Sequence, residues 1–326
     1  MDGKVLVTNP VIEEGLSGLR QHFDVTVAHG LDPRQLRRAI VGVDGLLPLL
    51  TVAVDEELLV HADRLRVIAN HAVGYDNIDL EAARRRGIWV TNTPGVLTEA
   101  TADLTWAAML ALVRRVVEGD ALVRSGGFTG WEPRMLLGID LQRKTLGIVG
   151  LGQIGRAVAR RAVGFGMRVI FTDPSCDAPV ELGGVHCEPR DLEQLLGEAD
   201  VVTLHAPLNA DTHHLLDDRR LGMMRAGAYL VNTARGPLVD EAALTRRLRQ
   251  GRPAGAALDV FEHEPAIAPG LAELPNVLLL PHIGSATRET RLAMTRLAAD
   301  NIQAVLQGRE PPTPVVRPDR PWPGSQ

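Results

Sequence analysis

Short apolar runs alternate with amphipathic stretches along most of this chain. The runs are rich in Val, Ile and Leu, and the stretches between them place apolar residues at helical spacing. Apolar runs without polar alternation are typical of strands that are buried on both faces of a parallel sheet. In the first part of the chain, the pattern predicts one small parallel sheet with strands at 5–7, 25–27, 45–47, 66–69 and 88–90.

The middle of the chain begins with a long helical pattern and continues with further buried strands. The turn Thr93-Pro94-Gly95 precedes a helix that is predicted from Thr98 to Arg124 and ends before a Ser-Gly-Gly turn. The strands predicted after this helix are one that runs into Gly150 and five at 167–172, 199–205, 228–233, 255–260 and 276–280.

The end of the chain predicts a discontinuous first domain. A last helix, 287–307, can return to the first sheet, and the proline-rich segment 311–326 is predicted to have no regular structure. We therefore expect a domain of residues 98–287, which includes the long linking helix 98–124. It is inserted into a smaller domain formed by 1–97 and 288–326.

The segment from Lys144 to Gly155 contains the pattern Gly-x-Gly-x-x-Gly. An apolar strand runs into Gly150, a helical pattern leaves Gly155, and a second strand ends in Asp173. Gly150 allows a tight turn, Gly152 lets the backbone approach a pyrophosphate, and Gly155 lets helix and strand pack closely. The N–H groups of the helix N-terminus bind phosphates. The predicted fold class is α/β, with a doubly wound Rossmann nucleotide-binding domain inserted into a smaller flavodoxin-like α/β substrate domain.

Asp173 predicts which dinucleotide binds. A carboxylate at this position accepts hydrogen bonds from the adenosine ribose hydroxyls. Its charge repels a 2′-phosphate, and the sequence has no arginine between Asp173 and Arg190 that offsets it. The predicted cofactor is therefore NAD rather than NADP.

The composition limits the classes of function. With 326 residues, 45% of them hydrophobic and 23% charged, the chain can bury a sizeable core in two domains. The net charge of −5 gives no reason to expect nucleic acid or an anionic membrane as a partner. The first residues lack the pattern of a signal peptide, and the longest apolar run, 46–54, is too short to span a bilayer. We therefore expect a cytoplasmic protein.

The sequence predicts neither a disulfide nor a metal site. Cys176 and Cys187 are the two cysteines, and reduced thiols are the usual state in the cytoplasm. No spacing of His, Cys or carboxylates is typical of a metal site, and the adjacent pair His213-His214 is expected to have no further ligands nearby.

Arg235, Glu264 and His282 each follow a different predicted strand of the second domain. The carboxyl ends of parallel strands meet at one edge of a sheet, where such folds bind their ligands. An arginine, a carboxylate and a histidine are thus expected to converge beside the nucleotide.

These motifs resemble those of the D-isomer-specific 2-hydroxyacid dehydrogenases over nearly the whole chain. The resemblance rests on four segments: 150–155, 232–236, 259–265 and 281–287. The segments most similar to glyoxylate/hydroxypyruvate reductases are 71–79, 91–94, 123–126, Trp131, Pro133 and 137–138. The implied activity is the NAD(H)-dependent reduction of a small 2-keto acid to the D-2-hydroxy acid.

The resemblance also implies catalytic roles for three residues. Arg235 binds the carboxylate and the carbonyl of the 2-keto acid through charge-assisted hydrogen bonds. His282 gives a proton to the ketone oxygen as the hydride reaches the carbon. Glu264 fixes the tautomer of the His282 imidazole and keeps the ring protonated.

Further binding residues are implied in the same way. Backbone N–H groups of Val73 and Gly74, in a loop that includes Ala72, hold the substrate carboxylate. Trp131 resembles an aromatic residue that reaches the active site of the neighbouring subunit in some relatives. Asp259 binds the nicotinamide carboxamide. The other implied cofactor-binding residues are Thr101, Gln153, Ile154, His205, Pro207 and Thr233.

Three assignments stay open in the sequence. Glu262 lies two residues before Glu264, and the neighbour Pro265 and the family pattern favour Glu264 as the partner of His282. His71 precedes the substrate loop and fits a substrate contact and a packing or surface role equally well. Trp131 also fits a position in a core or an interface.

Two other functions fit parts of the pattern. An NADH-sensing binding protein of the same fold exists among relatives, although the complete set of Arg235, Glu264 and His282 favours catalysis. The alternative substrate is another small anion, such as phosphite or a phosphonate. Phosphite dehydrogenases resemble this chain at 207–212, but they have a lysine where this sequence has Ala72, and the missing charge weakens the binding of a dianion.

The predicted helix 98–124 also predicts a homodimer. Leu104, Ala108, Leu112 and Val116 recur at helical spacing, with Trp106, Met109 and Val113 on an adjoining stripe. Such a helix is too apolar for a free surface, and relatives dimerise through this region. We therefore expect part of it to pack against a second subunit related by a two-fold axis.

Overall fold

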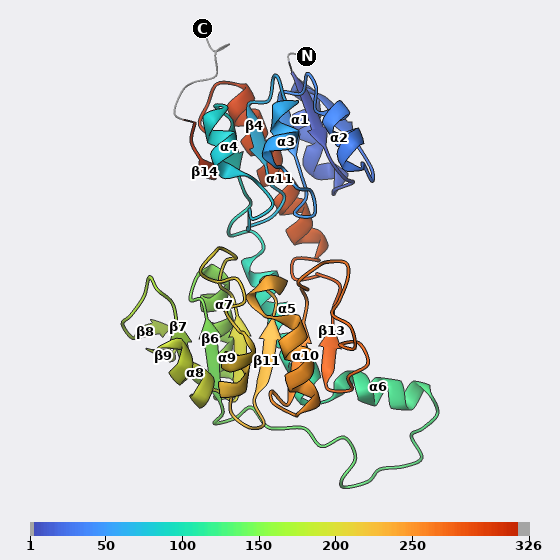
Figure 1. Ribbon diagram of the computed structural model, residues 1–326, viewed down its shortest axis with the longest axis vertical. Helices are drawn as coiled ribbons and strands as arrows, with labels where there is room; N and C mark the ends of the chain where they lie inside the picture. The colour runs from blue at the N-terminus through green and yellow to red at the C-terminus, as the bar shows by residue number, and fades with distance from the viewer. Residues whose placement is uncertain (1–2, 319–326) are drawn as a thin grey trace. The chain divides into compact units, whose positions relative to one another are not determined.

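The structure is a computed structural model that describes residues 3–318, and its contacts divide the chain into two compact units. Unit 1 comprises Met1–Leu97 and Ser285–Gln326, and unit 2 comprises Thr98–Gly284. Unit 2 is thus an insertion in the sequence of unit 1. In each unit, helices cover both faces of a mostly parallel sheet (Figure 1).

Unit 1 is built on a six-stranded sheet. Its strands are β1 (Lys4–Val7), β2 (Asp24–Val27), β3 (Gly45–Leu47), β4 (Val67–Ala69), β5 (Trp89–Thr91) and β14 (Pro314–Val316). The order is β14-β5-β4-β3-β1-β2, and β1 to β5 are parallel. The five parallel strands have the flavodoxin-like order, which confirms the fold predicted for this part of the chain.

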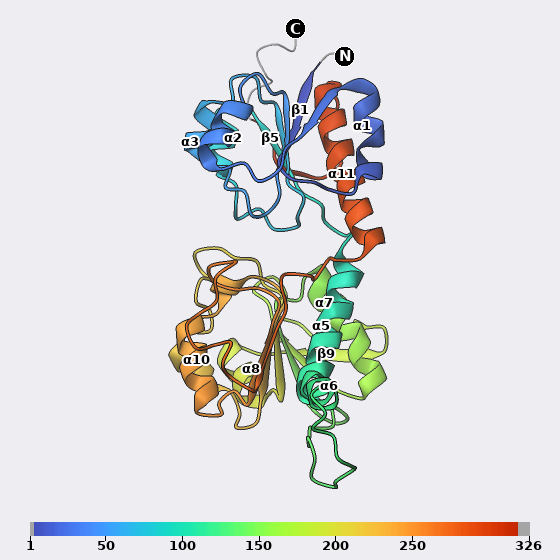
Figure 2. The ribbon, with the colours of Figure 1, turned by 90° about the vertical axis from the view of Figure 1, so that its right-hand side faces the viewer.

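The helices of unit 1 enclose one core on each face of this sheet (Figure 2). They are η1 (Glu13–Leu16), α1 (Ser17–His22), α2 (Pro33–Ala39), α3 (Glu56–Val60), α4 (Leu80–Arg85) and α11 (Arg288–Leu306). Helices α1 and α11 pack together on one face, and α2, α3 and α4 lie on the other. The side chain of Thr287 caps α11 by accepting a hydrogen bond from the N–H of Thr290.

The end of the described chain contains a strand that the proline content does not predict. Pro314 lies opposite Thr91 and Val316 opposite Val90, so β14 pairs antiparallel with β5 at the edge of the sheet. The Oγ1 of Thr313 donates to the carbonyl of Asn92 at 2.6 Å. The prediction of no regular structure was therefore wrong for 314–316, because an edge strand tolerates proline where its missing N–H would face outward. Residues 319–326 of the same prediction lie outside the described residues.

Unit 2 is built on an eight-stranded sheet. Its strands are β6 (Thr145–Val149), β7 (Arg168–Thr172), β8 (Val180–Leu182), β9 (Val185–Pro189), β10 (Val201–Leu204), β11 (Tyr229–Asn232), β12 (Gly255–Leu258) and β13 (Val277–Leu279). The order is β13-β12-β11-β10-β6-β7-β9-β8, parallel except for the hairpin of β8 and β9. The order reverses between β6 and β10, as in a doubly wound nucleotide-binding sheet.

Helices of unit 2 lie on both faces of its sheet. They are α5 (Thr98–Val113), α6 (Val116–Arg124), α7 (Gln153–Arg161), η2 (Ala162–Phe165), α8 (Leu192–Glu198), α9 (Asp218–Met223), η3 (Gly236–Leu238) and α10 (Glu241–Arg249). One core lies under α5 and α7, where Trp106 stacks on Phe165 at 4.4 Å, and the other under α8, α9 and α10. Among the described residues, no helix has the length and apolarity that crossing a bilayer requires.

The long helix expected over 98–124 is two helices. Helix α5 ends at Val113, Arg115 has a φ of 55°, and α6 starts at Val116. The carbonyl of Val113 accepts a hydrogen bond from the N–H of Ile139. A Cβ at Gly138 would overlap that same carbonyl, so the returning chain occupies the place where the helix would continue. The single-helix prediction was wrong because this long-range contact leaves no local signal.

Candidate active site

The glycine motif joins β6 to α7 with the geometry that a dinucleotide requires. Gly150 has a φ of 91°, and a Cβ there would lie 2.7 Å from the backbone of His205 and Ala206. A Cβ at Gly155 would overlap the carbonyl oxygen of Gly150. At Gly152, by contrast, nothing lies within 4 Å of the place of a Cβ. Open space thus faces the N-terminus of α7, where a pyrophosphate fits.

Asp173 follows β7 and lies against the glycine loop. Its Oδ2 accepts a hydrogen bond from the N–H of Leu151 at 2.7 Å, and its Oδ1 accepts from the N–H and the Oγ of Ser175. Burial raises the pKa of this carboxyl, but the hydrogen bonds from Ser175 and Leu151 outweigh it and the pKa is lowered. A fixed negative charge therefore stands at the position where the ribose is expected to bind.

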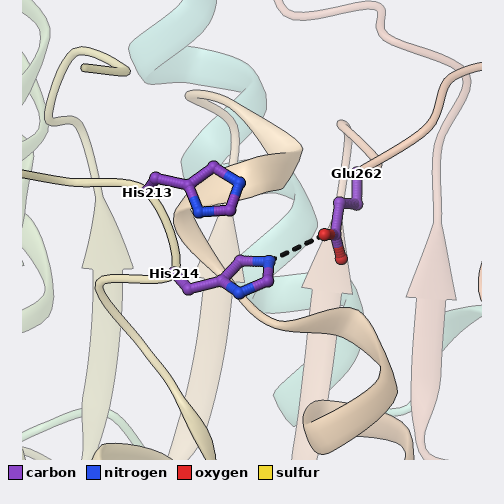
Figure 3. Close-up of side chains that lie close together, drawn as sticks. All are labelled: His213, His214 and Glu262. Carbon is purple, nitrogen blue, oxygen red and sulfur yellow. Dashed lines mark hydrogen bonds and ion pairs between the residues drawn. The ribbon is translucent and has the colours of Figure 1, made fainter. Parts of the chain in front are cut away.

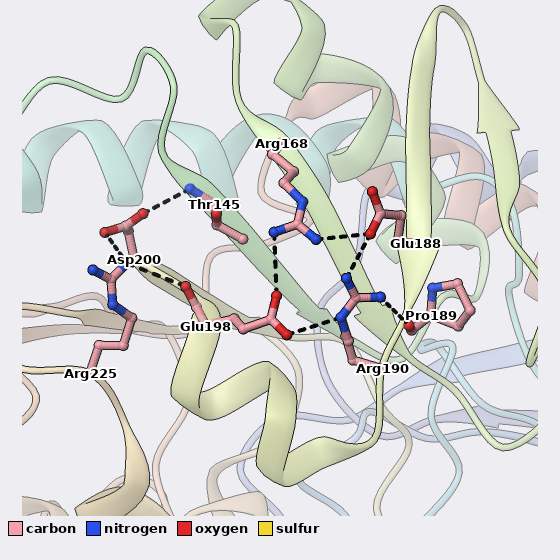
Figure 4. Close-up of polar contacts among 8 residues, drawn as sticks. All are labelled: Thr145, Arg168, Glu188, Pro189, Arg190, Glu198, Asp200 and Arg225. Atoms are coloured by element: carbon pink, nitrogen blue, oxygen red, sulfur yellow. Dashed lines mark hydrogen bonds and ion pairs between the residues drawn. The ribbon is translucent and has the colours of Figure 1, made fainter.

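Two arginines, Arg190 and Arg156, are candidates to offset the negative charge of Asp173. The guanidinium of Arg190 is held by Glu188 at 2.7 Å and by Glu198 at 3.0 Å, in a network that also contains Arg168 (Figure 4). Arg156, on α7, was overlooked in the sequence, yet its charge helps to lower the pKa of Asp173. A cation, Arg156, therefore lies near the carboxylate of Asp173. The two residues are far apart in the sequence, but the start of α7 brings Arg156 close to the glycine loop.

The other residues of the expected cofactor set also lie in unit 2. The Oγ1 of Thr98 donates to Gln153 at 3.3 Å, and Thr105 shares a 2.8 Å hydrogen bond with Thr233. The side chain of Thr101 approaches Gly284. Burial lowers the pKa of His205 to about 3, so this ring is neutral near pH 7. Ile154 packs against the core under α5 and α7, and Pro207 accepts a hydrogen bond from Thr212.

His282 and Glu264 form a hydrogen-bonded pair at the carboxyl edge of the sheet. The Nδ1 of His282 lies 2.9 Å from the Oε2 of Glu264, and the other oxygen of Glu264 accepts from the N–H of Phe261. Burial raises the pKa of Glu264, but the hydrogen bond and charge of His282 and the charge of Arg235 outweigh it, so the pKa is lowered. An ionised carboxylate beside Nδ1 fixes the tautomer of the ring and leaves Nε2 for a reacting group.

Arg235 reaches this pair because its turn packs closely on the segment of Glu264. The side-chain amide of Asn232 donates to the carbonyl of Arg235, and its oxygen accepts from the N–H of Ala234. A Cβ at Gly236 would overlap the carbonyl of Phe261, so only glycine allows this approach. The buried Asn232, within the motif 232–236, is a positioning residue whose role the sequence does not indicate.

Asp259 holds the backbone on which His282 sits. Its two carboxylate oxygens accept hydrogen bonds from the N–H groups of Ile283 and Gly284, at 2.8 and 2.7 Å. His282 has a φ of 55°, in the left-handed region that side chains rarely adopt. Because Asp259 is buried and fixes the two following residues, it holds His282 in this conformation. The expected contact of Asp259 with the nicotinamide stays a prediction.

Glu241, at the start of α10, is a further residue that the sequence did not single out. Its carboxylate accepts hydrogen bonds from the N–H groups of Glu262 and Ala268, at 2.8 and 3.0 Å. These two residues flank Glu264. Burial raises the pKa of Glu241, although the two N–H groups act in the opposite direction. Glu241 therefore clamps both ends of the segment that carries the partner of His282.

Glu262 belongs to a different pair. Its Oε1 lies 2.7 Å from the Nε2 of His214, and the ring of His213 stacks on that of His214 at 4.1 Å (Figure 3). The geometry thus separates the two candidate carboxylates, with Glu264 on His282 and Glu262 on His214. The expectation that the pair His213-His214 has no further ligand nearby was wrong, because the loop after β10, which carries the pair, meets the segment after β12, which carries Glu262.

The expected substrate loop lies in unit 1. The carbonyls of Ala72, Val73 and Gly74 accept hydrogen bonds from Thr93, Asn92 and Asn70, at 2.9, 2.7 and 2.8 Å. Among the described residues, the N–H groups of Val73 and Gly74 have no acceptor. With the carbonyls fixed on one side, these N–H groups are free to bind an anion.

Two aromatic candidates, His71 and Trp131, were left open by the sequence. His71 is buried in unit 1, with its Nε2 3.0 Å from the Oγ1 of Thr295, and burial and the charge of Arg291 lower its pKa to about 4. A packing role therefore fits His71 better than a surface role. The side chain of Trp131 is 81% exposed on the segment after α6, and no described contact joins it to Arg235, Glu264 or His282.

Comparison with known proteins identifies a family whose model this chain matches. The family model described as "D-isomer specific 2-hydroxyacid dehydrogenase, NAD binding domain" matches residues 106–284. The glyoxylate reductase of Thermococcus litoralis is 47% identical over 323 residues, which are 96% of this chain and 96% of the relative.

Two solved structures extend the similarity to the fold. The TT0316 protein from Thermus thermophilus is 51% identical with a TM-score of 0.90, covering 96% of this chain and 100% of that one. An NADPH-dependent glyoxylate/hydroxypyruvate reductase from Sinorhizobium meliloti, solved with NADP and malonate, is 32% identical with a TM-score of 0.87, covering 97% and 98%.

Proposed function

This chain belongs to the D-isomer specific 2-hydroxyacid dehydrogenase family, and from that membership we propose that it reduces glyoxylate, hydroxypyruvate or a similar small 2-keto acid with NADH. It is an oxidoreductase that uses NAD(H). The observation that carries the substrate and site assignments is the pairing of His282 with Glu264 beside Arg235, at the carboxyl edge of a nucleotide-binding sheet. The names of the relatives supply the size and type of the acid.

The geometry of these three residues supports the catalytic roles that we propose for them. Bound NADH supplies the hydride to the keto carbon. Arg235 presents a rigid cation that binds the carboxylate and the carbonyl oxygen of the acid. The Nδ1–H of His282 donates to Glu264, so the Nε2 of His282 carries the proton that passes to the carbonyl oxygen. Glu264 stabilises the protonated ring before the transfer and orients it afterwards.

The backbone of unit 1 supplies a second group of donors. We assign the N–H groups of Val73 and Gly74 to the substrate carboxylate, because they have no acceptor among the described residues while the neighbouring carbonyls are fixed. Backbone donors bind any small 2-keto acid by its common carboxylate, whatever its side chain. These two N–H groups therefore explain affinity for 2-keto acids as a class, but not a preference for one acid over another.

The preference for NAD over NADP rests on Asp173. Its lowered pKa keeps the carboxylate charged, and Arg190 is held by two other carboxylates. The S. meliloti relative is NADPH-dependent, so membership of the family does not by itself decide between the two cofactors. We also infer a cytoplasmic location, where NADH is regenerated and reduced cysteines such as Cys176 and Cys187 are usual.

A screen of acids with the purified chain tests the function. Glyoxylate, hydroxypyruvate, pyruvate and 2-ketobutyrate are each mixed with NADH, and the loss of NADH absorbance is followed; phosphite is mixed with NAD in parallel. We expect turnover with glyoxylate and hydroxypyruvate and none with phosphite. Binding of NADH without turnover of any acid would favour a sensor over an enzyme, and reduction of NAD by phosphite would replace the keto acid as substrate.

We propose that the chain forms a homodimer through α6 and the segment that follows it. The apolar residues expected on one long helix do not form one exposed face, because Trp106, Met109 and Val113 are buried within unit 2. The exposed apolar side chains are instead Val116, Val117, Val123, Phe128, Trp131 and Leu137. A cluster of this kind on one projecting segment (Figure 1) is typical of an interface.

Light scattering at micromolar concentration tests the assembly. A dimeric mass is expected for the parent chain, and Val123→Glu with Leu137→Glu should shift it to the monomer. If Trp131 also reaches the substrate of the partner subunit, as in some relatives, Trp131→Ala should raise the KM of the keto acid in a chain that stays dimeric. A monomeric parent would end both proposals.

A further inference from the structure

His213, His214 and Glu262 form a group of possible metal ligands that the reduction of a keto acid does not use. One ligand atom from each lies within 4.8 Å of the other two. Among residues 3–318, no other set of three His, Cys, Asp or Glu side chains meets this condition. The group lies in unit 2, where the turn after β10 meets the segment after β12 (Figure 3).

We propose that His213, His214 and Glu262 bind a divalent transition-metal ion, with Zn²⁺ as the expected ion. Two imidazoles and one carboxylate are a donor set that Zn²⁺ takes with a water as fourth ligand. Zinc bonds of about 2.0–2.2 Å in a tetrahedron place the donor atoms roughly 3.4 Å apart. The His214 Nε2 and Glu262 Oε1 are 2.7 Å apart, so a small separation of these two admits the ion.

The backbone of both histidines is fixed before any ion binds. The N–H of His213 donates to Asn209 at 3.0 Å, and the N–H of His214 donates to Pro237 at 2.7 Å. His214 has a φ of 49°, which turns its ring toward Glu262. The side chain of His213 is exposed and is the freest of the three to adjust to an ion. A site in which two of three ligands are already placed loses little conformational freedom on binding.

Hydrogen bonds with Glu241 hold Glu262 in place. Its Oε2 accepts from the N–H of Glu241, and its own N–H donates to the carboxylate of Glu241. Its side chain is 16% exposed, so the carboxylate is partly shielded from water and faces His214. Hydrogen bonds of this kind to a ligating carboxylate raise metal affinity by holding the ligand in place.

Binding exchanges a proton for the ion. The hydrogen bond between His214 and Glu262 holds one proton between Nε2 and Oε1. When the ion takes that place, the proton leaves Nε2 for Nδ1 or for solvent, and Nε2 becomes a ligand. Acid should therefore compete with the ion, and a chelator should restore the hydrogen bond.

Direct binding tests the site without any assay of turnover, so the result is independent of the proposed function. The chelator-treated full chain is titrated with Zn²⁺ by calorimetry and with Co²⁺ by visible absorption. We expect one ion per chain, with Co²⁺ bands of a tetrahedral or five-coordinate N/O site. His213→Gln and Glu262→Gln should each lower the affinity by roughly tenfold or more, since loss of even a supporting residue costs 10–100-fold.

A matched control separates this site from adventitious binding to any His–Glu pair. His186 lies 2.5 Å from Glu181 on the surface and has no third ligand in the described chain. His186→Gln should bind the ion as the parent does. The proposal is overturned if the parent binds no ion, or if His213→Gln and Glu262→Gln bind it as tightly as His186→Gln.

Discussion

Glu262 and Glu264 lie two residues apart and pair with different histidines, Glu262 with His214 and Glu264 with His282. The order of residues in the sequence does not show which of the two carboxylates pairs with His282, the proposed acid/base. The decision comes from the end of β13, which places His282 within 2.9 Å of Glu264 alone. This separation makes the two carboxylates open to independent tests.

Glu264→Gln keeps the shape of the side chain and removes its charge. The variant should lose keto-acid reduction at a lower pH than the parent, because an amide does not stabilise the protonated ring of His282. At neutral pH, kcat/KM should fall by about 10–100-fold, since a hydrogen bond to a charged group contributes about 1.5–3 kcal/mol. Profiles of kcat/KM against pH measure both effects. Glu181→Gln, which alters an exposed His–Glu pair, should follow the parent, and an unchanged Glu264→Gln profile would remove Glu264 from the mechanism.

His282→Ala removes the proposed proton donor. We expect kcat for reduction to fall by roughly 10²–10⁴-fold, the usual contribution of one general acid. The dissociation constant of NADH, measured by fluorescence, should stay within a few-fold, because the glycine motif and Asp173 follow other strands, β6 and β7. A variant with parental kcat and pH profile would mean that the proton comes from another group.

Asp173→Ser tests the reading of the ribose. The parent should favour NADH over NADPH by at least about tenfold in kcat/KM, which equals about 1.4 kcal/mol. Removing the carboxylate should lower the efficiency with NADH and raise it with NADPH, because the charge of Arg156 then meets the 2′-phosphate without a competing anion. The control is Asp177→Ser, an exposed carboxylate four residues on. Equal use of both cofactors by the parent would contradict the assignment.

Local patterns predicted the two sheets and the residues at their carboxyl edges. Val5, Leu46 and Ile68 lie in apolar runs that become buried parallel strands, and Arg235, Glu264 and His282 follow strands, as the pattern indicates. What could not be predicted depends on contacts between distant residues. The break after Val113 is caused by Gly138 and Ile139, and β14 exists only because Thr91 offers it an edge.

The same limit applies to residues that support the site. Glu241 reads as an acidic residue in the first turn of a helix, and nothing local indicates that its carboxylate is buried against Glu262 and Ala268. Arg156 and the contact of Glu262 with His214 are likewise visible only in three dimensions. Conversely, Gly150, Gly152 and Gly155 were predictable because their roles depend on the backbone alone.

Glu241→Gln tests the clamp on the segment of Glu264. The amide nitrogen of glutamine faces one of the two N–H groups that the carboxylate accepts, so one buried donor loses its partner. The free energy of unfolding should fall by about 1–3 kcal/mol. Because Glu264 shifts with its segment, kcat should fall and the pH profile should move in the same direction as in Glu264→Gln, with NADH affinity retained. A loss of stability with parental kcat and pH profile would make Glu241 a purely structural residue.

His71 predicts how acid destabilises the protein. Its folded-state pKa is lowered to about 4 by burial and by Arg291, whereas the unfolded chain has the ordinary value of 6.5. Between pH 6.5 and 4 the unfolded state therefore binds the proton and the folded state does not, so stability falls as the pH falls through this window and no further below it. The loss amounts to about 3 kcal/mol. In His71→Gln this part should vanish, while the loss due to His205, whose pKa is about 3, should persist. Unfolding by denaturant between pH 7 and pH 4 measures the difference, and equal acid sensitivity of the two chains would show that His71 is not held neutral by the fold.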